Sequence, residues 1–503
     1  LHVRSRRQRQ MCIRDRFLVM YQEIGLLVLI LLVFLFDTFS SKGAPRGLSM
    51  FTIVLFGLLT LAGFVTPCDK EVASAFGGMY VTSPTMIAIK NVLNIGVLIV
   101  LIQAKGWAHT DFMKVRRGEF YELLLITLFG MYLMISARHF LLFIIGLETA
   151  SLPLAALVAF DKNRYESHEA AVKYILTAVF SSAIFMMGLS FVYALAGTLY
   201  FNDIAASIID GGAMLIVAVA FVIAGMGFKL SLVPFHLWTA DVYQGAPTAI
   251  TSYLSVISKG AAAFAFFVIM VQVFGPFYHQ IWEWMLYALI ILTITVGNLF
   301  ALRQKNLKRF LAFSSISQAG YIMLGVIAGS AQGLGSLMFY ILVYIFSNLA
   351  AFGVIQSIES KTGRVDMDSY NNLYSTNPKL AFTMMLAMFS LAGIPPFAGF
   401  FSKFFIFSTA VASGSVALYI LVLIALINTI ISLYYYLLVV KAMFINNQEE
   451  CAIATFRSSL SDRVGMWICV AGIILVGLVS CIYNGLVNTS VHNPEYIFTI
   501  FAN

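Results

Sequence analysis

Long apolar runs separated by short polar stretches fill most of the chain, and this pattern predicts an all-α polytopic membrane protein. A helix of about 20 apolar residues crosses the ~30 Å hydrocarbon core of a bilayer, and about fourteen runs are long enough. We therefore expect no sizeable soluble domain. The predicted spans cover residues 17–36, 48–66, 85–103, 119–136, 138–160, 169–196, 213–238, 247–272, 282–302, 310–329, 335–358, 379–411, 415–441 and 463–486.

The seventh predicted span contains a proline and should be broken. Pro234 follows Lys229 by five residues, and a helical proline cannot donate to the carbonyl four residues back, which belongs to Leu230. We therefore expect the helix to open one turn after Lys229. Pro247 suits the first turn of a new helix, and Lys259 would lie roughly 18 Å along that helix, near the membrane midplane.

The twelfth predicted span has a similar break. Pro395 and Pro396 would free the carbonyls of Leu391 and Ala392, and Lys403 follows soon after. Broken spans seven and twelve are five spans apart, so they cross in opposite directions, as in two inverted five-helix repeats. The predicted units are three N-terminal helices in 17–118, repeat one in 119–272, repeat two in 282–441, and a last helix and tail in 442–503.

Two ionisable residues lie deep inside predicted spans, where charges are expensive and usually serve ions or protons. One is Lys259, and the other is Glu148, about 15 Å along the fifth span from Arg138. We expect Glu148 to meet Lys229, because a nearby lysine lowers the cost of burying a carboxylate. Two plainer interpretations stay open: Lys259 snorkels to the surface, or Glu148 and Lys229 form a structural ion pair without a transport role.

Other polar residues of the spans have weaker signals. His236 lies in the opened segment after Pro234, where a proton-relay role and an interfacial position are both consistent with the pattern. Five hydroxyl side chains in the eighth span are consistent with a water-filled passage to Lys259, and also with helix packing alone. They are Thr248, Thr251, Ser252, Ser255 and Ser258. Interfacial positions are expected for residues near span ends, namely Lys90, Lys173, Lys441, Glu23, Glu283, Asp37, His139 and His279.

Composition agrees with a membrane protein that has no redox or metal centre. Only 11% of residues are charged, against about 25% in soluble proteins, and the mean hydropathy is +0.90. The five cysteines form no CxxC or Cys/His pattern, so we expect no iron–sulfur cluster, zinc site or disulfide framework. No nucleotide-binding glycine motif follows a strand, and no nucleic-acid partner is expected.

The loop charges predict the orientation. Loops after odd-numbered spans hold seventeen lysines and arginines, from Lys42 to Arg463, whereas loops after even-numbered spans hold only Lys70 and Arg138. Positive loops face the cytoplasm, so both termini should face outward. Residues 1–16 contain six arginines and would violate this rule, which favours a non-native tail over a basic arm that binds anionic lipid.

Five stretches together identify a family. They are GLETASLPLAALVAF (146–160), EAAVKYILTAVFSSAIFMMGLSFVYALAGT (169–198), FKLSLVPFHLWTADVYQGAPTAITSYLSVISKGAAAF (228–264), NLKRFLAFSSISQAGYIMLG (306–325) and LAGIPPFAGFFSKFFIF (391–407). The chain resembles the antiporter-like membrane subunits of respiratory complex I over about residues 17–490. Three features differ from subunits L and M of that family: no histidine precedes Lys259, the twelfth span carries Lys403, and the chain ends soon after span fourteen. The resemblance therefore favours another antiporter-like subunit of the same complex.

The resemblance implies a proton-pumping subunit of a bacterial inner membrane complex. Its partners would be other membrane-arm subunits and the lipid bilayer. Flavin, iron–sulfur clusters and quinone would act in subunits other than this chain. The family's charged axis falls on Glu148, Lys229, Lys259 and Lys403. Two alternatives remain, a subunit of a multisubunit sodium/proton antiporter and a purely structural membrane subunit.

Overall fold

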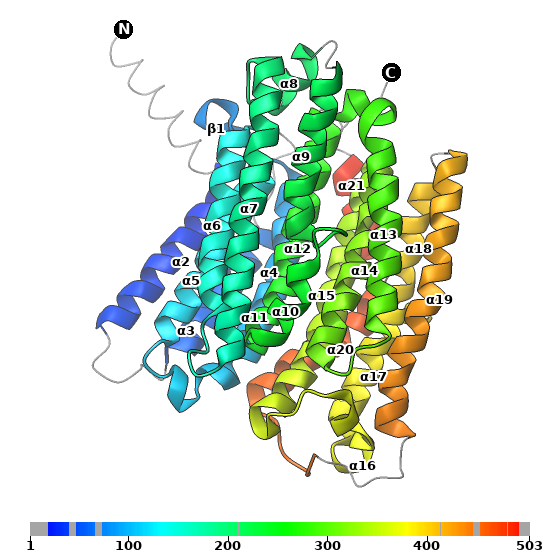
Figure 1. Ribbon diagram of the computed structural model, residues 1–503. Helices are drawn as coiled ribbons and strands as arrows, with labels where there is room; N and C mark the ends of the chain where they lie inside the picture. The colour runs from blue at the N-terminus through cyan, green and yellow to red at the C-terminus, as the bar shows by residue number, and fades with distance from the viewer. Residues whose placement is uncertain are drawn as a thin grey trace.

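The protein is a bundle of long helices that run roughly along one axis, with its N-terminal helices on one flank and α19 on the other (Figure 1). The computed structural model describes residues 19–39, 47–65, 73–208, 212–412, 414–445, 453–479 and 481–491. Within these ranges, thirteen helices are long and apolar enough to cross a membrane. Two shorter apolar helices, α17 and α18, form the remaining broken span, so the predicted all-α architecture of about fourteen spans is confirmed.

The continuous spans other than the eighth are α2 (Tyr21–Phe39), α3 (Leu48–Val65), α4 (Pro84–Ala108), α5 (Arg117–Ser136), α6 (Phe140–Val158), α7 (Tyr165–Ala196), α9 (Gly212–Leu230), α13 (Glu283–Ala301), α14 (Leu307–Ile327), α15 (Ala331–Thr362), α19 (Val416–Phe444) and α20 (Leu460–Leu478). The eighth span consists of α11 (Thr248–Tyr253), the π-turn η3 (Leu254–Ser258), α12 (Lys259–Val268) and the π-turn η4 (Ile269–Val273). Short elements are β1 (Ala73–Ala75), β2 (Tyr80–Thr82), α8 (Phe201–Ser207), α10 (Leu237–Gly245), α16 (Leu373–Thr376), α17 (Pro378–Ala392), α18 (Ala398–Val411), α21 (Cys481–Val491), and the single turns η1 (Phe76–Gly78), η2 (Asp111–Met113), η5 (Gly275–Phe277), η6 (Tyr278–Trp282) and η7 (Met367–Tyr370).

Burial divides the spans into a centre and a lipid-facing shell. The eighth span, α14 and α15 are buried throughout their apolar windows, whereas α2, α3 and α19 leave most of theirs exposed. An exposed apolar face suits the hydrocarbon of a bilayer, where every backbone group must be satisfied within the helix. The central helices are shielded from lipid by this shell, which is why they can carry polar side chains.

The seventh span breaks as predicted, but one turn earlier. Helix α9 ends at Leu230, directly after Lys229, instead of one turn later. Ser231 adopts a positive φ of 59°, and its amide donates to the carbonyl of Phe228 at 3.0 Å. The amide of Leu232 donates to the carbonyl of Gly227 at 2.8 Å. These contacts resemble a Schellman cap, so the helix closes before Pro234 reaches it.

Several predicted boundaries shift. The third span continues to Ala108, the sixth begins at Tyr165, and the fourteenth ends at Leu478 and is followed by the separate helix α21. The third and sixth spans extend into polar sequence, because a helix is set by its caps and not by the membrane core alone. The predicted tail at residues 1–16 lies outside the described residues.

Candidate functional site

Three lysines occupy the interior of the bundle, in three different spans. Their exposed fractions are 8% for Lys229 in α9, 3% for Lys259 in α12 and 5% for Lys403 in α18. Lysine side chains this buried, in apolar helices, are expensive unless they are paired or can lose their proton. These residues are three of the four relay residues predicted from the sequence.

Lys229 has no fixed partner for its ammonium group. Among the described residues it forms no hydrogen bond and no direct ion pair. The carboxylate of Glu148 in α6 lies within electrostatic range of it, and the side chain of Glu148 is only partly buried. The structure therefore brings the predicted pair into the same region without the direct contact that we expected.

Close helix packing places Glu148 on its side of the bundle. Helices α5 and α6 approach so closely that a Cβ atom on Gly130 would lie 2.4 Å from the amide nitrogen of Ala150. Only a small residue permits this approach, and small residues are common where membrane helices pack. The register of α6 against α5 is therefore fixed around Glu148.

Aromatic side chains support the broken segment beside Lys229. The ring of Trp238 packs on those of Phe228 and Tyr174, with centroids 4.9 and 5.3 Å apart, and its indole nitrogen donates to the carbonyl of Phe228 at 3.2 Å. Tyr174 also lies within electrostatic range of Glu148. This arrangement holds the opened backbone next to Lys229.

Lys259 is bound by a neighbouring helix. Its Nζ donates to the hydroxyl of Ser315 in α14 at 2.6 Å, and it lies 5.4 Å from the ring centroid of Tyr243. The hydroxyl of Tyr243 also lies 3.4 Å from that of Ser315, within hydrogen-bonding distance, and Tyr344 in α15 lies close to Ser315. The π-turn η3 ends directly before Lys259, and such turns frequently occur at functional sites.

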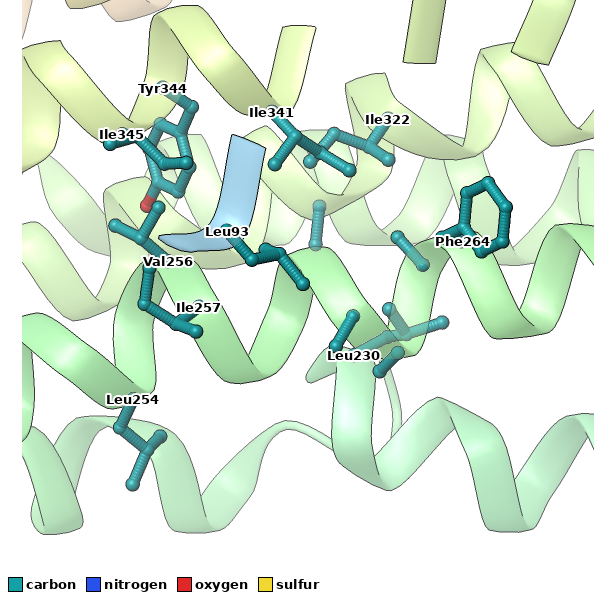
Figure 2. Close-up of a cluster of buried hydrophobic side chains, with 14 of the residues drawn as sticks. Leu93, Leu230, Leu254, Val256, Ile257, Phe264, Ile322, Ile341, Tyr344 and Ile345 are labelled. Carbon is teal, nitrogen blue, oxygen red and sulfur yellow. The ribbon is translucent and has the colours of Figure 1, made fainter. Parts of the chain in front are cut away.

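Apolar side chains enclose the helix that carries Lys259. Figure 2 shows Leu93, Leu230 and Ile341 around the eighth span, together with Ile257 on the span itself. A Cβ atom on Gly260 would lie 2.9 Å from Ile341 and 3.1 Å from Leu93, so the helices are in close contact beside the lysine. Water therefore has little room around Lys259 except along polar side chains.

Lys403 caps the broken twelfth span. Its Nζ donates to the carbonyls of Leu391 at 3.0 Å and Ala392 at 2.9 Å, and it lies 5.3 Å from the ring centroid of Tyr321. The sequence predicted that the Pro395–Pro396 break frees these two carbonyls. Both accept from the lysine because α17 ends at Ala392 and the chain continues in another direction.

A small cavity of about 10 Å³ connects Lys403 with α14 and α15. That volume is about the least that holds one water molecule. Polar groups of Gln318, Tyr344 and Ser402 line it, and Tyr344 also lies close to Ser315, the partner of Lys259. The interior therefore contains polar groups that run from Lys259 toward Lys403.

His236 is buried in the broken segment, with 8% of its surface exposed. Its ring interacts with the backbone of Pro234 and lies within electrostatic range of Lys259. Its Nδ1 has no hydrogen-bond partner among the described residues. The histidine is therefore buried within the protein, beside the break of the seventh span.

Three expected interfacial residues are buried instead. Lys90 (0% exposed) in α4 forms an ion pair with Glu23 (1%) in α2, and its Nζ donates to Ser136 at 2.7 Å and to Tyr80 at 3.4 Å. The strand β2 carries Tyr80 and covers this pair, which the sequence did not reveal. Glu283 is also buried, at 6% exposed.

The other span-end predictions divide by side-chain exposure. Lys173 remains half-exposed and pairs with Asp241 and Glu169, both at 2.7 Å, and Lys441 is exposed. Asp37 and His139 have intermediate exposure, and the side chain of His279 lies outside what the structure describes. No group of three or more metal-binding side chains was found among the described residues.

Sequence reasoning missed a second charged cluster at one end of the bundle. Glu359 in α15 accepts from Arg164 at 3.0 Å and from Lys308 at 3.3 Å, and it also accepts from the hydroxyl of Thr248. Lys308 is 1% exposed, although we assigned it to a loop. The predicted span began at residue 310, whereas α14 begins at Leu307, so Lys308 lies in the first turn of an entirely buried helix.

The chain matches the family described as "NADH:quinone oxidoreductase/Mrp antiporter, TM" over residues 137–432. It is 52% identical to NADH-quinone oxidoreductase subunit N of Phocaeicola vulgatus over 473 residues, which cover 94% of this chain and 98% of that relative. It is also 52% identical over 487 residues to the subunit N of Azobacteroides pseudotrichonymphae, with 97% and 98% covered.

Solved structures show the same fold. A chain of respiratory complex I from Thermus thermophilus with bound aureothin is similar with a TM-score of 0.77 and 31% identity, covering 91% of this chain and 97% of that chain. A chain of the Mrp complex from Dietzia sp. is similar with a TM-score of 0.83 and 20% identity, covering 95% and 98%. The second likeness concerns the fold alone.

Proposed function

The chain belongs to the NADH:quinone oxidoreductase/Mrp antiporter membrane family, and on that premise we propose that it is a proton-translocating subunit of NADH–quinone oxidoreductase. Relatives at 52% identity over almost the whole chain carry the name of that complex's subunit N. It is a multi-pass membrane protein, and its partners are other subunits of that complex. The antiporter alternative rests on a fold likeness at 20% identity.

The proposed relay consists of Glu148, Lys229, Lys259 and Lys403, with His236 as a further candidate. A carboxylate near a buried lysine favours the protonated form, whereas burial favours the neutral amine. A change in the position of the Glu148 side chain would therefore change the proton affinity of Lys229. The single observation that carries this proposal is that all three lysines are buried in the bundle interior.

Polar side chains support transfer between Lys259 and Lys403. A proton that leaves the Lys259 ammonium would pass to the hydroxyl of Ser315, which already accepts from it at 2.6 Å. Tyr344 lies close to Ser315 and lines the cavity beside Lys403, so water in that cavity would complete the path. The two carbonyls at Lys403 would stabilise the ammonium that forms.

The finer parts of the assignment are also proposals. We propose that this chain holds no redox centre and that flavin, iron–sulfur clusters and quinone act in other subunits. We propose the bacterial inner membrane as its location, with both termini on the outer side, because positive charges gather in the opposite loops. The division into two inverted repeats, at 119–272 and 282–441, is proposed from the two broken spans.

The experiment is proton pumping driven by NADH oxidation in inverted membrane vesicles, comparing wild type with Lys259→Ala at matched amounts of assembled complex. We expect pumping to fall at least tenfold, whether or not electron transfer falls with it. Unchanged pumping and unchanged electron transfer would favour the purely structural alternative. Sodium-dependent exchange without NADH would favour the antiporter.

A further inference from the structure

One carboxylate at an end of the bundle joins elements of both proposed repeats. Glu359, in the last turn of α15, accepts from Arg164 at 3.0 Å, from Lys308 at 3.3 Å and from the hydroxyl of Thr248. Lys308 also donates to the carbonyl of Ala246 at 2.9 Å. These partners belong to the starts of α7, α14 and α11 and to the segment before α11, so Glu359 lies where four segments meet.

The burial of this cluster is graded toward solvent. The side chain of Lys308 is 1% exposed, that of Glu359 is 15% exposed, and that of Arg164 is 41% exposed. A buried ion pair contributes little net stability compared with apolar residues of similar size. Because 15% of its side chain is exposed, Glu359 is reachable from water on one side, and its other side accepts from Thr248 of the eighth span.

The eighth span carries a polar stripe that begins at Glu359. Thr248, Ser252, Ser255 and Lys259 follow one another at intervals of four, three and four residues along the span, and the π-turn η3 lies directly before Lys259. The stripe extends about 16 Å from Thr248 to Lys259. The carboxylate and the central lysine thus lie at the two ends of this run of polar side chains.

The far part of this stripe is already hydrogen-bonded. Asn348 in α15 donates to the hydroxyl of Ser255 at 2.9 Å and to that of Tyr344 at 2.9 Å. Tyr344 lies close to Ser315, which accepts from Lys259 at 2.6 Å. Hydrogen bonds therefore join Ser255 to Tyr344, and Tyr344 lies beside the acceptor of Lys259.

The near part of the stripe has apolar neighbours on α15. Between Glu359 and Asn348, the same face of α15 carries Ile355 and Phe352, both 0% exposed. The hydroxyl of Ser252 donates to the carbonyl of Ala249 in its own helix at 2.8 Å, and so it does not bridge the gap. In this arrangement a break of about 10 Å separates Thr248 from Ser255.

We propose that Glu359 is the proton-uptake residue for Lys259, and that the apolar contact at Ile355 and Phe352 closes the path between them. This inference rests on the proposed function. A hydronium ion in the water at this end of the bundle gives its proton to the ionised carboxylate of Glu359 and leaves a water molecule. When water enters the gap, the carboxylic acid gives that proton to the water chain, and the neutral amine of Lys259 takes up a proton at the other end.

The cations around Glu359 control when it can hold a proton. Two positive charges favour the ionised carboxylate, so one of them must move away before the proton stays. Arg164 is the mobile one, because 41% of its side chain is exposed, whereas Lys308 is also held by the carbonyl of Ala246. Departure of Arg164 would weaken the link between α7 and α15 and leave Glu359 open to water.

The test uses the intact complex in inverted membrane vesicles, with NADH oxidation, proton pumping and the amount of assembled complex measured together. At matched assembly, Glu359→Gln should lower proton pumping at least tenfold, while Glu359→Asp should retain it within about threefold. The matched control is Glu169→Gln, an exposed carboxylate at the same end of the bundle that pairs with Lys173 at 2.7 Å. It should pump as wild type does, because exposed ion pairs are worth little.

A second variant tests whether Glu359 takes up protons or only holds helices together. Arg164→Gln removes one cation beside Glu359 but leaves the carboxylate, so Glu359 should hold its proton at higher pH, and pumping should persist to higher pH than in wild type. If Arg164→Gln and Glu359→Gln instead lower pumping equally and in proportion to lost assembly, Glu359 only holds helices together and the inference is wrong. Normal pumping in Glu359→Gln also overturns it, and loss of pumping in Lys259→Ala would then still support the proposed function.

The closed gap has its own readout, which serves if Glu359→Gln fails to assemble. Ile355→Ser places a hydroxyl in the apolar gap and should raise the passive proton leak of vesicles at least threefold. Val354→Ser is the control, since Val354 is equally buried but lies on another face of α15. An unchanged leak in Ile355→Ser would contradict the assignment of this contact as the closure.

Discussion

The two broken spans each hold a buried lysine, yet they hold it in opposite ways. Lys403 donates to two backbone carbonyls that the break of its own span has freed, at 3.0 and 2.9 Å. Lys229 lies beside an equally abrupt break but has no hydrogen bond among the described residues, only the electrostatic influence of Glu148. The same kind of break therefore leaves one ammonium group held by two backbone carbonyls and one whose stabilisation depends on another helix.

This difference indicates which lysine can change its proton affinity during turnover. A backbone carbonyl moves only if the helix end is rebuilt, whereas a carboxylate on a side chain moves by changing its rotamer. Glu148 is partly exposed and has no direct ion pair with Lys229 in the structure. The first proposed repeat thus offers a variable charge, and the second offers a fixed one.

The largest expected effect is at the fixed site. Lys403→Met removes the donor from two buried carbonyls, and each unsatisfied buried group costs about 1–3 kcal/mol. We expect lower stability of the assembled complex and at least a tenfold loss of proton pumping. Thermal unfolding of the purified complex and vesicle pumping measure the two effects. Lys379→Met, at an exposed position, is the control, and an equal loss in it would contradict the comparison.

A buried pair outside the proposed relay provides a structural reference. Glu23→Gln leaves the ammonium of Lys90 buried without its carboxylate, and such a loss typically costs about 3–5 kcal/mol. We expect a lower melting temperature, and normal pumping per assembled complex. If pumping per complex falls while the melting temperature is unchanged, then Glu23 and Lys90 take part in proton transfer.

At the variable site we expect a functional effect without a structural one. Glu148→Gln removes the charge that favours protonated Lys229, so pumping should fall about three- to tenfold, equivalent to roughly 1 kcal/mol. Since no direct contact is lost, the melting temperature should stay close to that of wild type. A large drop in assembly would instead indicate a structural ion pair.

The smallest effect is expected at the link between the two lysines. Ser315→Ala removes the hydroxyl that accepts from Lys259 and that lies 3.4 Å from the hydroxyl of Tyr243. A water molecule can take the place of a hydroxyl, so pumping should fall only about threefold. The conservative change Ser315→Thr should keep pumping close to that of wild type. Complete loss of vesicle pumping in Ser315→Ala would contradict this expectation.

The sequence predicted the features that depend on local chemistry. Proline placement gave both breaks and identified the carbonyls of Leu391 and Ala392 that Lys403 occupies. Counting residues along a helix placed Lys259 and Glu148 deep in their spans. The predicted end of α9 was wrong because Ser231 adopts a positive φ, a local conformation that the nearby proline did not indicate.

The features that the sequence did not give depend on contacts between distant segments. Lys90 and Glu23 are 67 residues apart and looked like span-end anchors, until packing and the strand carrying Tyr80 buried them. Glu359 likewise meets Arg164, which is 195 residues away. Helical position predicts how deep a side chain lies in the membrane, but only the arrangement of helices determines whether it faces lipid, water or another charge.

The most direct test of the account is the structure of the assembled complex, determined both at rest and during NADH oxidation, with attention to the two broken spans. We predict that the Glu148 carboxylate moves between a separated position and an ion pair within ~4 Å of the Lys229 ammonium. Lys403 should keep its contacts to Leu391 and Ala392 in both states. A constant separation between Glu148 and Lys229, together with a Lys403 that leaves its carbonyls, would contradict the assignment of variable and fixed sites.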